Sequence, residues 1–209
     1  MRQVILAVIL SSASGLAAAQ QVQSCTKVER QAVNEALRSA KSLTLAAAAA
    51  VADTENYERW FGKYTPRHSD VVRANLKSVF TAIKSGRVTT TCAAIGFGAC
   101  ERSTYAFVYP DEPYNVYVCP PFFDLPTMAS LRPEHPSGDN GTREGTFIHE
   151  ISHFTRVART VDRCYSRVDC SQMAQTDAFT AVRNADSYQY FTEDITLFRN
   201  PPAAAKPDQ

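Results

Sequence analysis

The sequence predicts an α+β fold that is mainly α-helical and carries one small antiparallel sheet. Apolar residues recur at helical spacing between positions 26 and 86 and again after position 142. Between these regions the chain is rich in Val, Thr and Tyr and is divided by glycines and prolines, which is typical of short strands joined by turns. The 209 residues suffice for one sizeable hydrophobic core and show no linker, so we expect a single domain over residues 20–200.

The first 19 residues have the pattern of a secretory signal peptide. Arg2 supplies a positive charge, residues 4–10 form an apolar run, and the alanines at 17–19 offer a cleavage site. A membrane anchor is the alternative, but serines interrupt the run, which is shorter than the roughly 18 to 20 residues that a span needs. We therefore expect a secreted, extracellular protein.

Three helices are expected in the N-terminal half. Thr26 and Glu29 have the spacing of a capping box, which predicts a long helix that ends near residue 52. A short helix is expected over residues 54–61, because a glycine follows it. The third helix is expected to begin at Ser69, and its apolar stripe stops at Gly86.

After residue 86 the sequence predicts short strands, then a long loop and finally two helices. The Val-, Thr- and Tyr-rich segments predict strands over residues 87–93, 104–109 and 115–119. Five prolines between positions 120 and 140 predict a long ordered loop. Helical spacing then predicts two helices, over residues 142–156 and about 176–191, and the composition predicts a flexible polar tail over residues 201–209.

The charge of the chain excludes several classes of partner. The formal net charge is +1, and removal of the first 19 residues takes away the charge of Arg2 and leaves none. Bulk charge would then attract neither nucleic acid nor a membrane, so we expect no such partner. We also expect the protein to be a monomer. Asn140, Gly141 and Thr142 form an N-glycosylation sequon, which is used only in the secretory pathway.

The most specific motif lies in the helix expected over residues 142–156. There His149, Glu150 and His153 form an H-E-x-x-H pattern. Four residues make nearly one helical turn, so both imidazoles project from one face and can bind one Zn²⁺, while Glu150 can reach the attacking water as general base. The alternative is a helix with two ordinary surface histidines, but the chain has only four histidines, so a chance match is rare.

A catalytic zinc ion needs a third protein ligand and leaves a fourth position for water. No histidine follows His153, which excludes the three-histidine pattern of the metzincins. Downstream carboxylates remain: Asp162, Asp169, Asp177, Asp186, Glu193 and Asp194. Asp162 lies nine residues past His153, far enough for the chain to leave the helix and return, and Tyr165 follows it.

With these residues the sequence resembles the deuterolysin-like, or aspzincin, secreted zinc endopeptidases, which include the fungal peptidyl-Lys metalloendopeptidases. The signature of that family is H-E-x-x-H-F-T followed by G-T-x-D-x-x-Y-G. This chain matches the first part at residues 149–155 and the second at residues 160–165, in the same register. Further matches at residues 60–62, 118–123 and 184–188 extend the resemblance over essentially the whole chain after the signal peptide.

The resemblance implies a zincin-like metalloprotease domain that hydrolyses protein or peptide substrates and uses Zn²⁺ as its cofactor. The zinc ligands that it implies are His149, His153 and Asp162. The general base that it implies is Glu150, and Tyr165 would donate a hydrogen bond to the oxyanion that develops during the reaction. A purely structural tyrosine is the alternative for Tyr165.

The resemblance also suggests a substrate preference. In the lysine-specific relatives, the aspartate that matches Asp186 lies at the S1′ pocket and pairs with a basic side chain. A basic residue at P1′, Lys in particular, is therefore expected, with Asp186 as the substrate-binding carboxylate. The alternative is that Asp186 caps a helix or orients a zinc ligand.

Two departures from the family pattern leave a second function open. The glycines that flank the second motif are replaced by Arg159 and Ser166, and both positions can demand a backbone that only glycine adopts easily. The alternative function is that of a secreted non-catalytic or weakly active effector, or of a zinc-binding protein, on the same fold.

Six cysteines in an oxidising compartment predict disulfide bonds. Cys164 and Cys170 lie six residues apart and suit a local bridge. The resemblance implies that the others pair as Cys25 with Cys92 and Cys100 with Cys119, although six cysteines allow fifteen pairings. A second metal site is the alternative, which the wide spacing of the cysteines disfavours.

Overall fold

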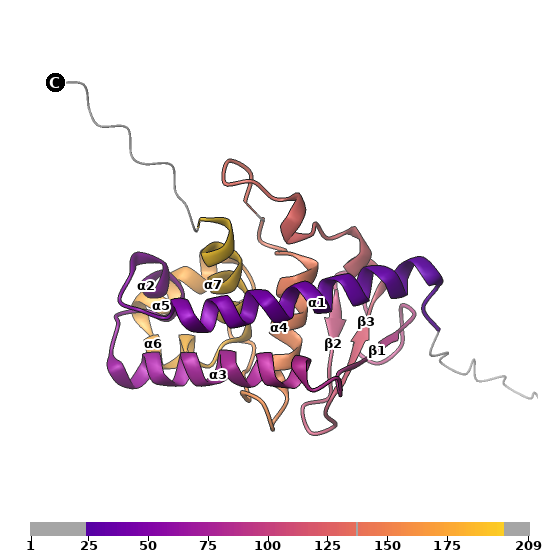
Figure 1. The fold of residues 1–209 in the computed structure, drawn as a ribbon, viewed down its shortest axis with the longest axis horizontal. Coiled ribbons are helices and arrows are strands. Elements are labelled where there is room, and N and C mark those ends of the chain that lie inside the picture. Colours follow the sequence, from indigo (N-terminus) through magenta and orange to yellow (C-terminus); the bar gives the residue numbers. More distant parts are fainter. Residues whose placement is uncertain (1–23, 137, 199–209) are drawn as a thin grey trace, which may run out of the picture.

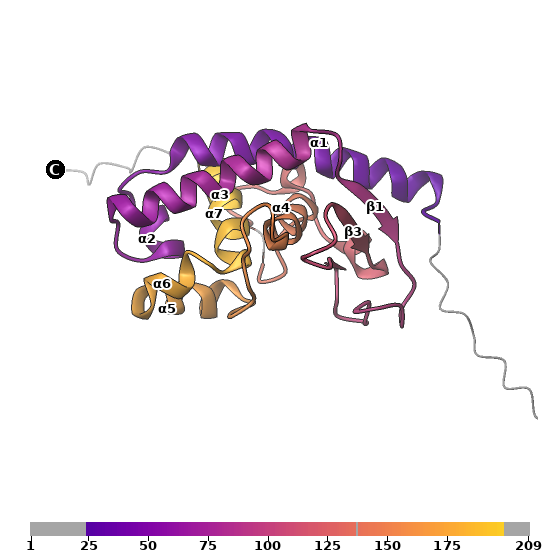
Figure 2. The same ribbon diagram turned by 90° about the horizontal axis from the view of Figure 1, so that it is seen from below.

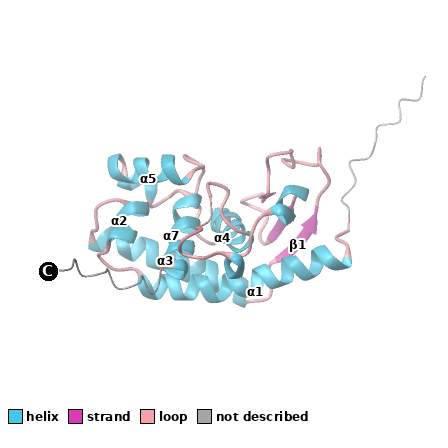
Figure 3. Cartoon of the chain, turned by 90° about the horizontal axis from the view of Figure 1, so that it is seen from above, coloured by secondary structure: helices cyan, strands magenta, loops and turns pink. Residues whose placement is uncertain are grey.

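The computed structural model describes residues 24–136 and 138–198. The predicted signal peptide and the predicted tail lie outside the described residues. Figure 3 shows that helices make up most of the described fold, with one small sheet at one end. Among the described helices, none is both long enough and apolar enough to cross a membrane.

The N-terminal helices are α1 (Lys27–Ala50), α2 (Glu55–Phe61) and α3 (Pro66–Lys84). The capping box of α1 is present, because the side chains of Thr26 and Glu29 each accept a hydrogen bond from the backbone amide of the other. α3 begins three residues before the predicted Ser69, since Thr65 caps it and Pro66 fits the first turn, where its missing N–H costs nothing. α1 and α3 lie side by side in two perpendicular views (Figures 1 and 2).

The sheet is mixed, and the prediction of an antiparallel sheet is wrong for one of its two pairings. Its strands are β1 (Thr89–Cys92), β2 (Ala106–Phe107) and β3 (Asn115–Val118), in the spatial order β1-β3-β2. β3 pairs antiparallel with β2 and parallel with β1. The chain reverses between β1 and β2 and again between β2 and β3, so β1 and β3 point the same way. Because β3 lies between the other two, that shared direction becomes a parallel pairing.

The segment between the sheet and the last helices is partly helical. It contains two short 3₁₀ helices, η1 (Pro120–Asp124) and η2 (Met128–Ser130), where the sequence predicts only an ordered loop. Each begins just after a residue with extended backbone and ends within a few residues. Helices of the 3₁₀ type are usually this short, with η1 at 5 residues and η2 at 3.

The C-terminal helices are α4 (Arg143–His153), α5 (Arg167–Thr176), α6 (Ala178–Ala181) and α7 (Ala185–Leu197). α4 ends three residues before the predicted residue 156. The single helix expected over residues 176–191 is wrong, because the backbone leaves helical geometry at Asp177, whose side chain accepts a hydrogen bond from the amide of Thr180 and caps α6. A second break precedes α7 at Asn184.

α4 is the central helix of the molecule. It contacts α1, α3 and α7 and both β2 and β3, and Figure 2 shows it between α7 and the sheet. The side chains of Phe147, Ile148 and Ile151 are fully buried there. Gly145 lets α7 approach closely, since a Cβ at this position would collide with a carboxylate oxygen of Glu193. The H-E-x-x-H motif is therefore carried by a helix that is fixed on several sides.

Three disulfide bonds use all six cysteines. Cys25, just before α1, is joined to Cys92 at the end of β1. The other bonds join Cys100 to Cys119 and Cys164 to Cys170. These are the pairings that the sequence and the resemblance imply, and they attach the long first helix to the sheet and brace the segment before α5.

Candidate active site

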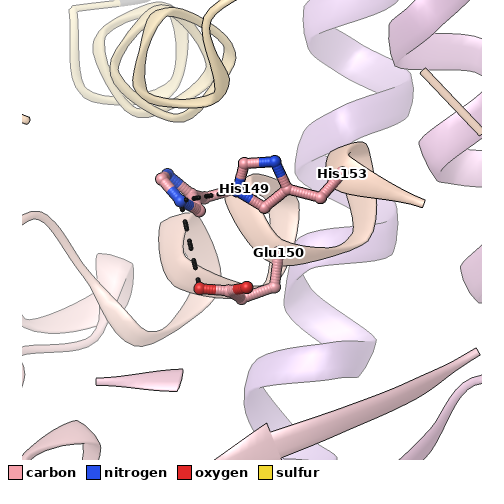
Figure 4. Close-up of side chains that lie close together, drawn as sticks. All are labelled: His149, Glu150 and His153. Carbon is pink, nitrogen blue, oxygen red and sulfur yellow. Dashed lines mark hydrogen bonds and ion pairs between the residues drawn. The ribbon is translucent and has the colours of Figure 1, made fainter. Parts of the chain in front are cut away.

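The H-E-x-x-H residues lie at the C-terminal end of α4, where both imidazoles project from one face with the Glu150 carboxylate beside them (Figure 4). The motif is largely buried, since His149 is 9% exposed and Glu150 is 7% exposed. At the other end of the helix, the Thr142 hydroxyl accepts a hydrogen bond from the amide of Gly145 and so caps α4. The local sequence thus forms the helix that aligns the three side chains.

Asp162 completes a triangle with the two histidines. The Nε2 atoms of His149 and His153 lie 3.1 Å apart, and the Asp162 carboxylate oxygens lie 3.4 Å and 3.3 Å from them, respectively. Ligands about 2.0 to 2.1 Å from a tetrahedral zinc ion are about 3.3 Å from one another. The three side chains therefore have the spacing of a tetrahedral zinc site with one position left open.

The hydrogen bonds of the two histidines leave both Nε2 atoms free to bind a metal. His153 Nδ1 lies 2.9 Å from the carbonyl oxygen of Thr160, which can only accept, so Nδ1 carries the proton. His149 Nδ1 lies 2.6 Å from Oδ1 of Asp186, which likewise fixes a proton on Nδ1. In the neutral imidazoles, both Nε2 lone pairs then point to the same place, which is the arrangement that zinc requires.

The charges of the site favour a bound cation. Burial opposes protonation of His149, but the hydrogen bond and charge of Asp186, helped by Glu150 and Asp162, raise the pKa of His149 to about 9. Burial raises the pKa of Glu150. Burial also acts to raise the pKa of Asp162. The hydrogen bond with His153 and the charges of His149 and His153 outweigh this effect, so the pKa of Asp162 is lowered. A divalent cation at the centre would satisfy the same negative charges.

Tyr165 and Asp186 occupy different places around the triangle. Tyr165 is 67% exposed. The partial burial of its phenol and the nearby charge of Asp162 both raise the pKa of Tyr165, so the hydroxyl stays protonated and can donate a hydrogen bond. Asp186 is buried at the start of α7, where it holds His149. Asp186 thus bonds a histidine of the motif and also lines the cleft, so its position is compatible with both roles that the sequence left open.

A cleft of about 820 Å³ opens over these residues. One wall contains β2 and its flanking residues, and another contains the segment 160–165 and the start of α7. Four carboxylates line it, those of Asp139, Glu150, Asp162 and Asp186. Among the described residues that line the cleft there is no lysine or arginine, so the cleft is acidic although the chain as a whole is nearly neutral.

The two departures from the family pattern have different structural outcomes. Ser166 has an extended backbone and caps α5 by accepting a hydrogen bond from the amide of Asp169, so this position has no need of glycine. Arg159 has a φ of 53°, in the left-handed region that favours glycine. The turn before Thr160 therefore keeps a glycine-like backbone with a bulky residue in it.

The other carboxylates that the sequence left open have other partners. Glu193 and Asp194 form ion pairs with Arg167, and the Asp177 carboxylate accepts a hydrogen bond from the amide of Thr180 at the start of α6. Asp169 lies in the first turn of α5 and does not line the cleft. Three residues that line the cleft lie outside the motifs that the sequence analysis singled out: Asp139, Gln189 and Tyr190. Thr160 and Asn184 lie within the matching segments 160–165 and 184–188, but spacing along the chain says nothing of what their side chains and carbonyls contact.

Comparisons with known proteins agree with this geometry. The family described as lysine-specific metallo-endopeptidase, the aspzincins, matches residues 46–193. An extracellular protease of Aeromonas hydrophila is 30% identical over 174 residues, which cover 81% of this chain and 46% of that protein. A peptidyl-Lys metalloendopeptidase of Grifola frondosa is 31% identical over 175 residues, which cover 81% of this chain and 45% of that protein. This chain therefore spans about half the length of these curated relatives.

A solved structure extends the likeness to three dimensions. The zinc peptidase from Grifola frondosa superimposes with a TM-score of 0.68 and 28% sequence identity, covering 81% of this chain and 97% of that one. The family match includes α4, the segment with Asp162 and Tyr165, and α7 through Glu193. The chain belongs to the aspzincin family of zinc metallo-endopeptidases.

Proposed function

We propose that this protein is a secreted zinc endopeptidase that hydrolyses protein or peptide substrates and acts as a monomer. The observation that carries the proposal is the convergence of His149 Nε2, His153 Nε2 and the Asp162 carboxylate at the spacing of a tetrahedral zinc site. Secretion is supported by the three disulfide bonds and by the likeness to an extracellular protease.

In this proposal, His149, His153 and Asp162 hold the zinc ion. When bound, zinc supplies a Lewis acid that polarises the scissile carbonyl and lowers the pKa of a bound water. Glu150 is the general base, because its Oε1 lies 3.9 Å from His149 Nε2 and so stands beside the metal position without being part of the triangle. It takes the proton from the attacking water and returns it to the leaving amine. Tyr165 donates to the developing oxyanion.

The edge of the sheet offers a way to align the substrate. β2 has β3 as its partner in the described sheet, and the residues on and around β2 line the cleft. A peptide in extended conformation can add to a strand edge through main-chain hydrogen bonds, which hold it without regard to its side chains. We propose that the substrate lies along β2 with its scissile bond above His149 and Glu150.

The acidic cleft supports a preference for a basic residue at P1′, with Lys as the first candidate. The hydrogen bond to His149 uses one oxygen of Asp186, so the other can meet a substrate ammonium group. Asp186 would then both orient a zinc ligand and bind substrate. The names of the Grifola frondosa relative and of the family agree with a lysine preference.

Asn140 is proposed as a glycosylation site. Its side chain is exposed and lies at the edge of the cleft, whereas the Thr142 hydroxyl of the same sequon is buried against Glu193. A glycan attached here would stand beside the entrance to the cleft. It would therefore restrict large protein substrates more than short peptides.

The decisive experiment is cleavage of a peptide library by the purified protein, with and without chelator, reading the residue after each cut. We expect chelator-sensitive cleavage before basic residues. Glu150→Gln should lower kcat by a factor of about 10² to 10⁴, the usual contribution of a general base, and should leave zinc content unchanged. Asp186→Asn should weaken the preference for a basic P1′ residue.

The matched control is Glu144→Gln. Glu144 is a buried carboxyl on the same helix, but it accepts a hydrogen bond from the amide of Met128 and does not line the cleft. This variant should keep its activity. Full activity of the Glu150→Gln protein would overturn the mechanism, and tight zinc binding without any turnover in the unmodified protein would favour the non-catalytic alternative.

A further inference from the structure

We propose that Asn184 is a positioning residue that sets the places of both Asp162 and Tyr165. The inference rests on the proposed function and assigns a role to a residue outside the zinc ligands. Asn184 directly precedes α7 and is fully buried. A fully buried side-chain amide is costly unless it is hydrogen-bonded, so its partners indicate what it is for.

Those partners lie between the two functional side chains. The Asn184 Oδ1 atom accepts hydrogen bonds from the backbone amides of Arg163 at 2.7 Å and Cys164 at 3.2 Å. Its Nδ2 atom lies 3.5 Å from the carbonyl oxygen of Cys164. One side chain thus satisfies the backbone of the two residues that separate Asp162 from Tyr165.

The backbone on either side of Asn184 holds the same segment. The amide of Val161 donates to the carbonyl of Arg183 at 2.8 Å, and the amide of Ala185 donates to the carbonyl of Val161 at 3.1 Å. Residues 161 and 184 form an isolated parallel bridge. The segment is therefore attached to the start of α7 at three successive residues, with Asn184 at the centre.

The segment needs such an attachment because it belongs to no helix or named strand, and its side chains at Val161 and Tyr165 are 41% and 67% exposed. Thr160 at its start is held by Ser152 and His153, and the Tyr165 carbonyl at its end accepts from the Tyr190 hydroxyl, so Asn184 is the side chain that holds the residues between them. The Cys164–Cys170 bond anchors one end of it. Without Asn184, two backbone amides would lose the acceptor shown in the structure, and the segment would be free to shift.

Asn184 also lies in the turn that links Asp162 to the residue holding His149. Two residues beyond it, Asp186 orients His149 through the 2.6 Å contact with Nδ1. The same turn therefore fixes one histidine and places the carboxylate that faces it. A shift of this turn would separate Asp162 from His149 and His153 even if α4 stayed in place.

The test compares Asn184 variants with a matched asparagine elsewhere. Asn184→Ala removes the Oδ1 atom that accepts from the amides of Arg163 and Cys164. Asn184→Asp keeps an acceptor oxygen at this position in a side chain of nearly the same size and shape. Asn75→Ala is the control, since Asn75 is a half-buried asparagine whose Nδ2 donates to the Tyr188 hydroxyl at 2.7 Å, away from the cleft. Zinc affinity is measured by competition with a chromogenic chelator, alongside melting temperature and kcat and KM on a lysine-containing peptide.

We expect Asn184→Ala to lower zinc affinity by a factor of about 10 to 100, the usual effect of removing a residue that supports metal ligands. kcat should fall while KM changes little, and Asn184→Asp should recover part of both losses. Asn75→Ala should lower the melting temperature without changing zinc affinity or kcat. If Asn184→Ala does not fold, Asn184→Ser, whose hydroxyl is too short to reach both amides, carries the same expectations.

The outcomes separate this inference from the proposed function. Unchanged zinc affinity and kcat in the Asn184 variant would overturn the positioning role and leave the proposed function standing. Equal losses in the Asn75 and Asn184 variants would also overturn it, since they would reflect general destabilisation. A wild-type protein that binds no zinc would overturn the proposed function and this inference with it.

Discussion

Arg159 adopts a backbone conformation that its side chain does not favour. Its φ of 53° is the one positive value at a non-glycine residue in the described part of the chain. The Cβ of an L-residue is crowded in this region, at a cost of about 1 to 2 kcal/mol. The turn persists because the Arg159 amide donates to the carbonyl of Phe154 and its Nε donates to the carbonyl of Thr155. The substitution therefore costs stability while the turn that leads to Asp162 is kept.

Arg159→Gly should raise the free energy of unfolding by up to about 1 kcal/mol. Glycine relieves the crowding, and the gain is partly offset by the greater freedom of glycine in the unfolded chain, about 0.4 to 1 kcal/mol. Urea denaturation measures the difference. Arg156→Gly, in the same turn but without a positive φ, should instead lower stability. Equal effects of the two changes would show that the backbone at Arg159 carries no cost.

Among the elements, α5 and α7 are joined by a buried ionic cluster. Arg167 at the start of α5 pairs with Glu193 at 2.9 Å and with Asp194 at 2.8 Å, and both carboxylates are almost fully buried. The Glu193 carboxylate also accepts from the amide of Thr142 at the start of α4, and Asp194 accepts from the indole of Trp60 on α2. Four helices therefore meet at this cluster, which lies about two turns along α7 from Asp186.

Arg167→Met should lower the free energy of unfolding by about 3 to 5 kcal/mol, because it leaves two buried carboxylates without their arginine. Urea denaturation gives the value. Asp70→Asn is the comparison, since Asp70 forms an exposed pair with Arg73 on the surface of α3, and loss of such a pair costs under about 1 kcal/mol. A small effect at Arg167 would mean that the cluster adds specificity without adding stability.

At the scale of the whole molecule, three separate parts of the chain meet at the proposed zinc site. α4 carries His149 and His153, the segment before α5 carries Asp162, and α7 holds His149 through Asp186. A metal ion bound there would connect these parts only in the folded state. Any ligand that binds the folded state alone stabilises it by mass action.

Removal of zinc should therefore lower the melting temperature. With zinc at about a thousand times its dissociation constant, the lost stabilisation is about 4 kcal/mol. In a domain of this size that corresponds to a shift of about 8 to 16 °C. Differential scanning calorimetry before and after chelation measures it, and added zinc should restore the higher value. Glu150→Gln should show the same shift, because Glu150 is not a proposed ligand. An identical melting temperature with and without metal would speak against a zinc site that joins these parts.

Features that depend on neighbours within a few residues could be predicted from the sequence alone. The cap at Thr26, the one-turn spacing of His149 and His153 and the short loop between Cys164 and Cys170 each follow from local geometry. The prediction of one helix over residues 176–191 is wrong because the Asp177 side chain accepts a hydrogen bond from the amide of Thr180 and caps a new helix there.

Features that depend on residues far apart in the chain required the folded structure. Only the folded chain shows that β3 lies between β1 and β2, that Asp162 alone of six carboxylates meets both histidines, and that Asn184 holds the segment that carries it. Spacing along the sequence limits which residues can meet but does not select among them. The selection is made by packing, because buried polar groups must find partners and those partners lie on other elements.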